Sequence, residues 1–132
     1  MSEALSPAQT EELHDILRRQ HAQLRDEVRT ELRESGQDQY LYMTEGAHDT
    51  GDASVADQLA ELNLDLLDRH IQALREVEAA LARIDTGDYG FCSEDEEPIG
   101  YQRLKANPTA RRCIACQERF ERTHAQPGHH TL

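Results

Sequence analysis

The stretch FCSEDEEPIGYQRLKANPTARRCIACQERF, residues 91–120, decides how the C-terminal part of the chain can fold. Cys113 and Cys116 form a C-x2-C knuckle, and Cys92 lies at the right distance upstream to begin a second knuckle. Two such knuckles about twenty residues apart supply the tetrahedral ligands of a structural zinc site. Asp95 stands where the second cysteine of the first knuckle is expected. The pattern therefore predicts a zinc-ribbon-like site with three thiolates and one carboxylate.

Three alternatives compete with this interpretation. Glu94 or Glu96 could supply the oxygen ligand in place of Asp95, since any carboxylate oxygen can bind zinc. Cys113 and Cys116 could form a redox dithiol, although no βαβ pattern surrounds them. The segment could also fold without metal, through the packing of Phe91, Ile99, Leu104 and Ile114. We expect zinc in a structural role, because nothing nearby suggests an open coordination position with a general base.

The composition limits the partners and compartments that fit the chain. Among 132 residues, 26 are acidic and 14 are basic, for a formal net charge of −12. A phosphate backbone would repel such a surface, so we expect no direct contact with nucleic acid. The sequence has neither an apolar run of roughly 20 residues nor a signal peptide, and we expect no membrane contact and a cytoplasmic location. Three cysteines fit a reducing compartment better than a disulfide framework.

Two long helical patterns precede the cysteine-rich part. Ser6 and Gln9 form a capping box that begins the first helix, and Gly36 ends it. Its apolar residues recur at spacings of four or seven: Leu13, Leu17, Leu24, Val28 and Leu32. The second helix is predicted over residues 55–84, with a stripe formed by Val55, Leu59, Leu62, Leu66, Leu67, Ile71, Leu74, Val77, Leu81 and Ile84. Narrow stripes of this kind predict an antiparallel coiled-coil hairpin.

The predicted fold is all-α dominated, with the long hairpin followed by a small zinc-ribbon-like globular part and a C-terminal helix. Residues 1–87 contain the N-terminal segment and the hairpin, whose tip is predicted at about residues 37–54. Residues 88–124 form the globular module, and residues 125–132 form a flexible tail. We do not expect an enzyme, because neither a pocket-forming fold nor a nucleophile–base pair is visible.

The string P-I-G-x-x-R-L-x-A-x-P-T-A-x-x-C-I-x-C, residues 98–116, closely resembles the DksA/TraR family of bacterial transcription regulators. The resemblance is strongest from Tyr89 to Glu118 and extends back through both helices. It implies a protein that binds RNA polymerase rather than DNA and inserts its hairpin tip into the polymerase secondary channel. The net charge fits this role, since an acidic tip near a catalytic magnesium ion has an electrostatic rationale.

The family's tip motif, D-x-x-D-x-A, matches Asp49, Asp52 and Ser54 when the chain is counted back from Cys92 without a gap. The resemblance implies that the two carboxylates act on the polymerase. Alternatively, the aspartates end the loop and cap the following helix, as Asp commonly does. Ser54 replaces the alanine of the family pattern and could itself be the N-cap.

Some members of the family act together with ppGpp, which basic side chains help to hold. The matching positions carry Glu76, Asn107 and Gln117 here. Because a carboxylate repels phosphate, we expect an effect on transcription that does not depend on ppGpp.

The changes at Asp95 and Ser54 suggest a divergent member of the family that works when zinc is scarce or the cell is stressed. One alternative function is a metal- or thiol-responsive stress protein, in which Cys92, Cys113 and Cys116 sense zinc or oxidant and the hairpin binds another partner. A second alternative is a coiled-coil adaptor without activity of its own.

Overall fold

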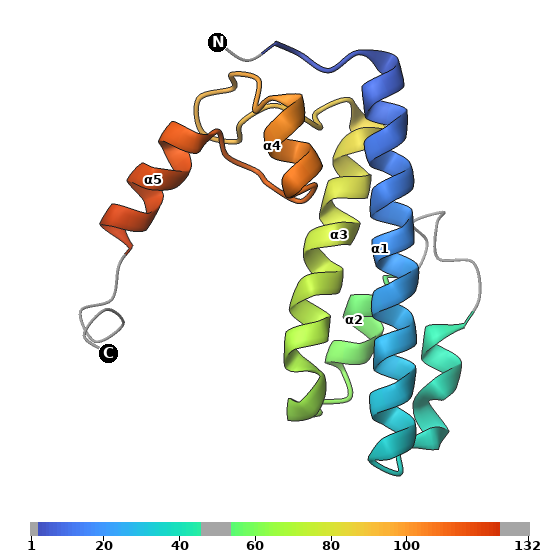
Figure 1. Cartoon of the computed structure of the whole chain (residues 1–132). Helices are drawn as coiled ribbons and strands as arrows, with labels where there is room; N and C mark the ends of the chain where they lie inside the picture. Colours follow the sequence, from blue (N-terminus) through green and yellow to red (C-terminus); the bar gives the residue numbers. More distant parts are fainter. Residues whose placement is uncertain (1–2, 46–53, 125–132) are drawn as a thin grey trace.

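The computed structural model describes residues 3–45 and 54–124, and over these residues the fold is built from helices (Figure 1). In chain order the elements are α1 (Pro7–Glu34), the 3-10 helix η1 (Asp38–Thr44), α2 (Val55–Ala60), the 3-10 helix η2 (Asp65–Leu67), α3 (Asp68–Thr86), α4 (Tyr101–Ala106) and α5 (Ile114–Thr123). None of these helices combines the length and the apolar character that a membrane span needs. The prediction of an all-α fold is confirmed.

The hairpin predicted from the two apolar stripes is present, and Figure 1 shows α1 and α3 running side by side in opposite directions. The capping box begins α1, because the Ser6 hydroxyl accepts a hydrogen bond from the Gln9 backbone N–H at 3.1 Å and the Gln9 side chain accepts one from the Ser6 N–H at 3.0 Å. Gly87 ends α3 with a left-handed φ of 83°. The two helices bury Leu13, Leu17, Val28, Leu32, Ile71, Leu74, Val77 and Ala80.

The prediction of one continuous helix over residues 55–84 is wrong. Helix α2 ends at Ala60, Asn63 takes a left-handed φ of 57°, and the long helix begins only at Asp68. The chain turns back, so that α2 packs beside α3 instead of extending it (Figure 1). The physical reason is tertiary burial, since this arrangement forms a cluster of Val28, Leu32, Val55, Ala56, Leu59, Leu67, Ile71 and Leu74.

Glu78 on α3 fixes the beginning of α2. Its carboxylate accepts a hydrogen bond from the Ser54 hydroxyl at 2.6 Å and one from the Val55 backbone N–H at 3.2 Å. The same carboxylate lies 2.8 Å from Nε2 of His21, which is buried on α1. One side chain therefore joins α1, α2 and α3.

These contacts make the stability of the docked α2 depend on pH. Burial raises the pKa of Glu78, but hydrogen bonds from His21 and Ser54 outweigh it and bring the pKa below its ordinary value of 4.5. The resulting stabilisation is complete above pH 4.5 and is lost as the pH falls through the lowered folded-state pKa. Between neutral pH and pH values below 4.5, we expect the unfolding temperature of the wild type to fall more than that of Glu78→Gln. The exposed Glu76→Gln should follow the wild type, and identical pH profiles for all three proteins would contradict the assignment.

The η1 segment also lies against the hairpin. The Arg29 guanidinium on α1 donates hydrogen bonds to the Thr44 hydroxyl at 2.7 Å and to the Leu41 carbonyl oxygen at 3.4 Å. Both described flanks of residues 46–53 therefore lie beside the body of the hairpin, one at Arg29 and the other at Glu78.

The C-terminal module packs on the opposite end of the hairpin from the turn between α1 and η1 (Figure 1). Tyr89 and Leu104 are buried against Leu13 and Leu17 of α1. The Tyr89 hydroxyl donates a hydrogen bond to the Pro108 carbonyl oxygen at 2.8 Å, and burial raises the pKa of this phenol to about 12. These contacts form a second apolar cluster, which anchors the segment that carries the cysteines.

Candidate metal centre

Backbone hydrogen bonds shape the first knuckle. The Cys92 N–H donates to the Glu97 carbonyl oxygen at 2.7 Å, and the Glu96 N–H donates to the Cys92 carbonyl oxygen at 3.0 Å. Glu96 adopts a left-handed φ of 63°, which turns the chain between them. An antiparallel bridge between Phe91 and Pro98 closes the base of the loop. The first knuckle is therefore a tight turn even though the sequence has no glycine at its centre.

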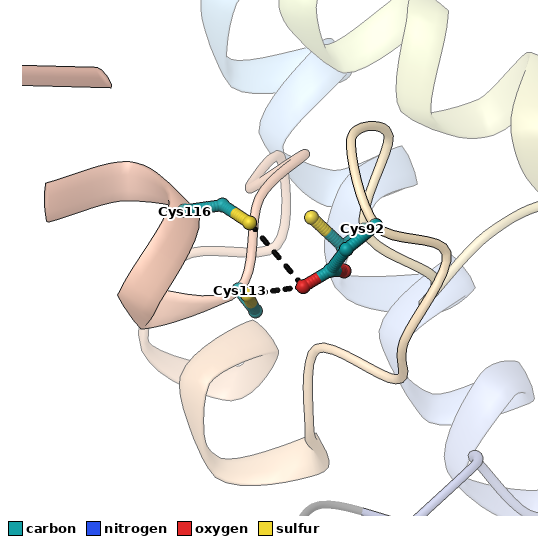
Figure 2. A group of neighbouring side chains, drawn as sticks. Cys92, Cys113 and Cys116 are labelled. Atoms are coloured by element: carbon teal, nitrogen blue, oxygen red, sulfur yellow. Dashed lines mark hydrogen bonds between the residues drawn. The ribbon is translucent and has the colours of Figure 1, made fainter. Parts of the chain in front are cut away.

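The second knuckle begins α5. Cys113 is the N-cap residue of this helix, and Cys116 is buried in its first turn. The Ser93 N–H donates to the Arg111 carbonyl oxygen at 2.8 Å, which joins the two knuckles. Figure 2 shows the side chains of Cys92, Cys113 and Cys116 converging from these two segments.

The geometry of the cluster fits a tetrahedral ion. One ligand atom from each of Cys92, Asp95, Cys113 and Cys116 lies within 4.8 Å of all the others. Oδ2 of Asp95 is 3.5 Å from Sγ of Cys113 and 3.3 Å from Sγ of Cys116, and these two contacts are the dashed lines in Figure 2. With zinc–sulfur bonds of about 2.3 Å and zinc–oxygen bonds of about 2.0 Å, a tetrahedral site has sulfur–oxygen separations of roughly 3.5 Å. The donor set and its spacing therefore suit zinc.

Asp95 is oriented for this position. Its Oδ1 accepts a hydrogen bond from the Glu97 N–H at 3.0 Å, so Oδ2 is the oxygen that faces the sulfur atoms. This N–H, followed by the thiols of Cys92 and Cys116, lowers the pKa of Asp95 to about 2. The carboxylate is therefore ionised at neutral pH, as a metal ligand must be.

The structure distinguishes Asp95 from Glu94 and Glu96, the two alternative oxygen ligands. Glu94 forms an ion pair with Arg112, with Oε2 lying 3.2 Å from Nε. Neither Glu94 nor Glu96 belongs to the group of converging ligand atoms found among the described residues. The carboxylate at position 95 is thus the one brought to the cysteines.

The four apolar residues expected to hold the segment together without metal differ in their burial. Ile99 and Leu104 are buried in the core, as that alternative requires. Phe91 and Ile114, in contrast, are 40% and 63% exposed. Only two of the four side chains are therefore buried in the core, so their packing gives the knuckles less support than the metal-free alternative requires.

The surroundings of Cys92 and Cys116 shift the pKa values of their thiols in opposite directions. Burial raises the pKa of Cys92, but backbone N–H groups of Asp95, Cys113 and Glu94 outweigh it, so the net pKa is lowered. Burial, followed by hydrogen bonds with Cys113 and Asp95, raises the pKa of Cys116 to about 12. Metal binding at Cys116 must therefore displace a proton, which couples the affinity for zinc to pH.

Sequence reasoning missed Arg119. Its Nη2 donates a hydrogen bond to Sγ of Cys116 at 3.0 Å. The signal that could have found it is the spacing of three residues on α5, which places two side chains on the same helix face. A cation beside the sulfur stabilises the thiolate form that a metal requires.

Of the three residues of the expected tip motif, the structure describes only Ser54. Ser54 is the N-cap of α2, and its hydroxyl accepts a hydrogen bond from the Asp57 N–H at 3.0 Å. Asp49 and Asp52 lie outside the described residues. The capping role considered for Ser54 is thus confirmed.

Comparisons with known proteins agree with the fold and with the cysteine cluster. The family profile described as "Prokaryotic dksA/traR C4-type zinc finger" matches residues 87–122. "RNA polymerase-binding transcription factor DksA" of Caulobacter vibrioides (strain NA1000 / CB15N) is 39% identical over 79 residues, which cover 60% of this chain and 56% of the relative. The chain thus spans little more than half of that relative's length.

A longer match reaches through the hairpin. The protein of the same name from Escherichia coli (strain K12) is 31% identical over 117 residues, which cover 87% of this chain and 73% of the relative. The solved structure of transcription factor DksA2 from Pseudomonas aeruginosa has a TM-score of 0.66 and 33% identity, with 92% of this chain and 89% of that chain covered. The chain therefore belongs to the DksA/TraR family.

Proposed function

We propose that this protein is a transcription regulator that binds RNA polymerase and inserts its hairpin into the secondary channel to modulate initiation. The main support is that the likeness to DksA2 covers 92% of the chain, so that it includes the hairpin as well as the cysteine module. The relatives named above are RNA polymerase-binding transcription factors. A partner of RNA polymerase works where the polymerase does, so the proposal places the protein in the cytoplasm and gives it no enzymatic activity of its own.

The shape of the hairpin supports insertion into a channel. Helix α1 has 28 residues, and a helix of that length extends about 42 Å. The module lies at one end of the hairpin, which leaves the other end free of the module (Figure 1). Within the proposal, Asp49 and Asp52 act on the polymerase, and the net charge of −12 keeps the protein from contacting nucleic acid directly.

The cofactor in this proposal is one structural zinc ion, held by Cys92, Asp95, Cys113 and Cys116. When bound, it would cross-link the loop after α3 to the first turn of α5. Three thiolates and one carboxylate fill a tetrahedral site, so they leave no position for a reacting water. The zinc would thus serve the fold of the module.

The proposed action does not require ppGpp. Glu76 and Asn107 lie together in a cavity of about 300 Å³ between the hairpin and the module, where Glu27 also lines the wall. None of the described residues that line this cavity is basic. Gln117 instead donates a hydrogen bond to Glu121 at 2.9 Å. Carboxylates in this cavity would repel a polyphosphate.

We therefore predict that ppGpp leaves the activity of the protein unchanged in purified transcription. The measurement compares initiation with and without ppGpp at saturating protein. The double variant Glu27→Lys/Glu76→Lys is the matched comparison, because it reverses the charge of the cavity wall. A clear enhancement of the wild-type protein by ppGpp would contradict this part of the proposal.

Cross-linking tests insertion of the hairpin. A photoreactive amino acid placed at the exposed Ser35, where α1 ends, should form covalent links to polymerase segments that line the secondary channel. The same probe at the exposed Glu121 on α5 is the control, and it should not reach those segments. Links from Ser35 to another part of the polymerase would reject insertion while keeping the partner. The absence of any link would reject both.

A further inference from the structure

The local sequence does little to cause the break between α2 and α3. Residues 55–86 contain neither glycine nor proline, and their apolar stripe continues through the break. Leu64 and Leu67, the N-cap residues of η2 and α3, form no side-chain capping hydrogen bond. Leu66 remains 41% exposed. Single-turn backbone hydrogen bonds close the break, from the Leu62 N–H to the Leu59 carbonyl oxygen at 3.1 Å and from the Leu67 N–H to the Leu64 carbonyl oxygen at 2.9 Å. Since no residue of this stretch is a strong helix breaker, the same residues can also form one continuous helix.

Two charged side chains hold the region on either side of the break against the hairpin. Glu78 on α3 binds the first residues of α2, through the Ser54 hydroxyl at 2.6 Å and the Val55 N–H at 3.2 Å. Arg29 on α1 binds the end of η1, through the Thr44 hydroxyl at 2.7 Å. We call α2 and η1 together the folded-back unit.

The folded-back unit also packs as one body. Tyr40, Leu41 and Met43 of η1 lie against the same cluster that buries Val55, Ala56 and Leu59 of α2. The two elements contact each other as well as the hairpin. The unit could therefore leave the hairpin as a pair that keeps part of its apolar surface covered.

We propose that the folded-back unit switches between this position and an extended one, in which residues 55–86 form a single helix and η1 continues alongside it. Glu78 and Arg29 hold the folded-back position together with the apolar cluster that buries α2. In a continuous helix, Ser54 and Glu78 would be separated by about 36 Å along the axis, so their hydrogen bond cannot exist in both states.

The functional consequence rests on the proposed function. Residues 55–64 would add about 15 Å to the hairpin in the extended state, at 1.5 Å per residue. A longer hairpin reaches further into a channel, so the extended state is the active one and the folded-back state is inactive. Polymerase binds the extended state better, and it therefore shifts the equilibrium towards it.

A distance measurement tests the switch directly. Spin labels are introduced as non-natural amino acids at Asp57 on α2 and Arg75 on α3, so that the cysteines remain unlabelled. These exposed side chains are 3.9 Å apart in the folded-back state, and their loose ion pair contributes little. In the extended state the two positions would be about 27 Å apart along one helix. Labels at Asp68 and Arg75, both on α3, form the control pair, whose distance should not change.

We expect the free wild-type protein to show mainly the short distance. Glu78→Ala and Arg29→Ala should each shift a large part of the population to the long distance, and the double variant should shift most of it. Ser54→Ala removes the hydrogen bond to Glu78 and the capping hydrogen bond from the Asp57 N–H. It leaves the bond from the Val55 N–H and the pair of His21 and Glu78 in place, so it should give a smaller shift than Glu78→Ala. Circular dichroism identifies any variant that has simply unfolded, because the extended state keeps or gains helix.

Two results would overturn the switch: a short distance that persists in all folded variants and in the polymerase complex, or a long distance as the dominant state of the free wild type. Other results would contradict the proposed function and leave the switch intact, or the reverse. If the variants extend but the wild type does not bind polymerase, the switch stands and the partner is wrong. If the wild type binds polymerase at an unchanged short distance, the partner stands and the switch is wrong.

Discussion

Cys116→Ala is expected to abolish zinc binding and to unfold the module of residues 88–124, while α1 and α3 remain helical. Cys116 is fully buried and belongs both to the ligand cluster and to the core that joins the module to the hairpin. Binding of structural zinc contributes about 10–16 kcal/mol in small zinc-binding peptides, which is more than a short segment gains from its own packing. The loss of one thiolate should therefore outweigh any other single change in the module.

The measurement combines zinc content per chain with the thermal unfolding of the module. Wild-type protein should carry one zinc ion per chain, and a strong chelator should unfold the module as Cys116→Ala does. Asp95→Cys should bind zinc more tightly than the wild type because it restores a fourth thiolate, and Asp95→Ala should bind it more weakly. Glu94→Ala is the matched control, since this neighbouring carboxylate lies outside the cluster. A stable wild-type module without metal would contradict the zinc assignment.

The double variant Asp49→Asn/Asp52→Asn is expected to bind RNA polymerase but to lose at least about tenfold of its effect on initiation. The proposal assigns these carboxylates to the active region of the polymerase, and an amide keeps their size while removing their charge. Affinity should change little, because most of the interface would come from the hairpin and the module.

The control for this variant is Asp38→Asn/Asp65→Asn, which removes the same charge from two exposed positions near the end of the hairpin. Both variants are compared with the wild type in one transcription assay, with binding measured separately. Full activity of both double variants would exclude a role for Asp49 and Asp52 in the effect on initiation. Equal loss in both would show that net charge, rather than the motif, matters.

Local signals in the sequence predicted much of the fold. Ser6 and Gln9 form the capping box that their spacing indicated, and α1 ends at Glu34, just before Gly36. Capping and apolar periodicity act over a few residues, so they can be read without knowledge of the tertiary structure. The spacing of the cysteines likewise predicted that Cys92, Asp95, Cys113 and Cys116 converge.

The break between α2 and α3 and the contact between the module and α1 could not be predicted, because both involve segments that are distant in the sequence. The break after Ala60 accompanies the burial of α2 against α3 and the hydrogen bond between Ser54 and Glu78, which are 24 positions apart in the sequence. The contact of the module with α1 includes a hydrogen bond that the Tyr101 hydroxyl donates to Glu12 at 2.5 Å. Such pairs leave no periodic or spacing signal in a single sequence, because each partner alone has the appearance of an ordinary surface residue.

The most direct test of the central claim is the affinity of the purified, zinc-loaded protein for bacterial core RNA polymerase, measured by titration at several salt concentrations. We expect saturable binding of one protein per polymerase, weakened by salt because added ions screen the attraction between this protein, of net charge −12, and basic side chains of the polymerase. Absence of saturable binding by the folded protein would contradict the proposal, and the fold shared with DksA2 would then serve a different partner.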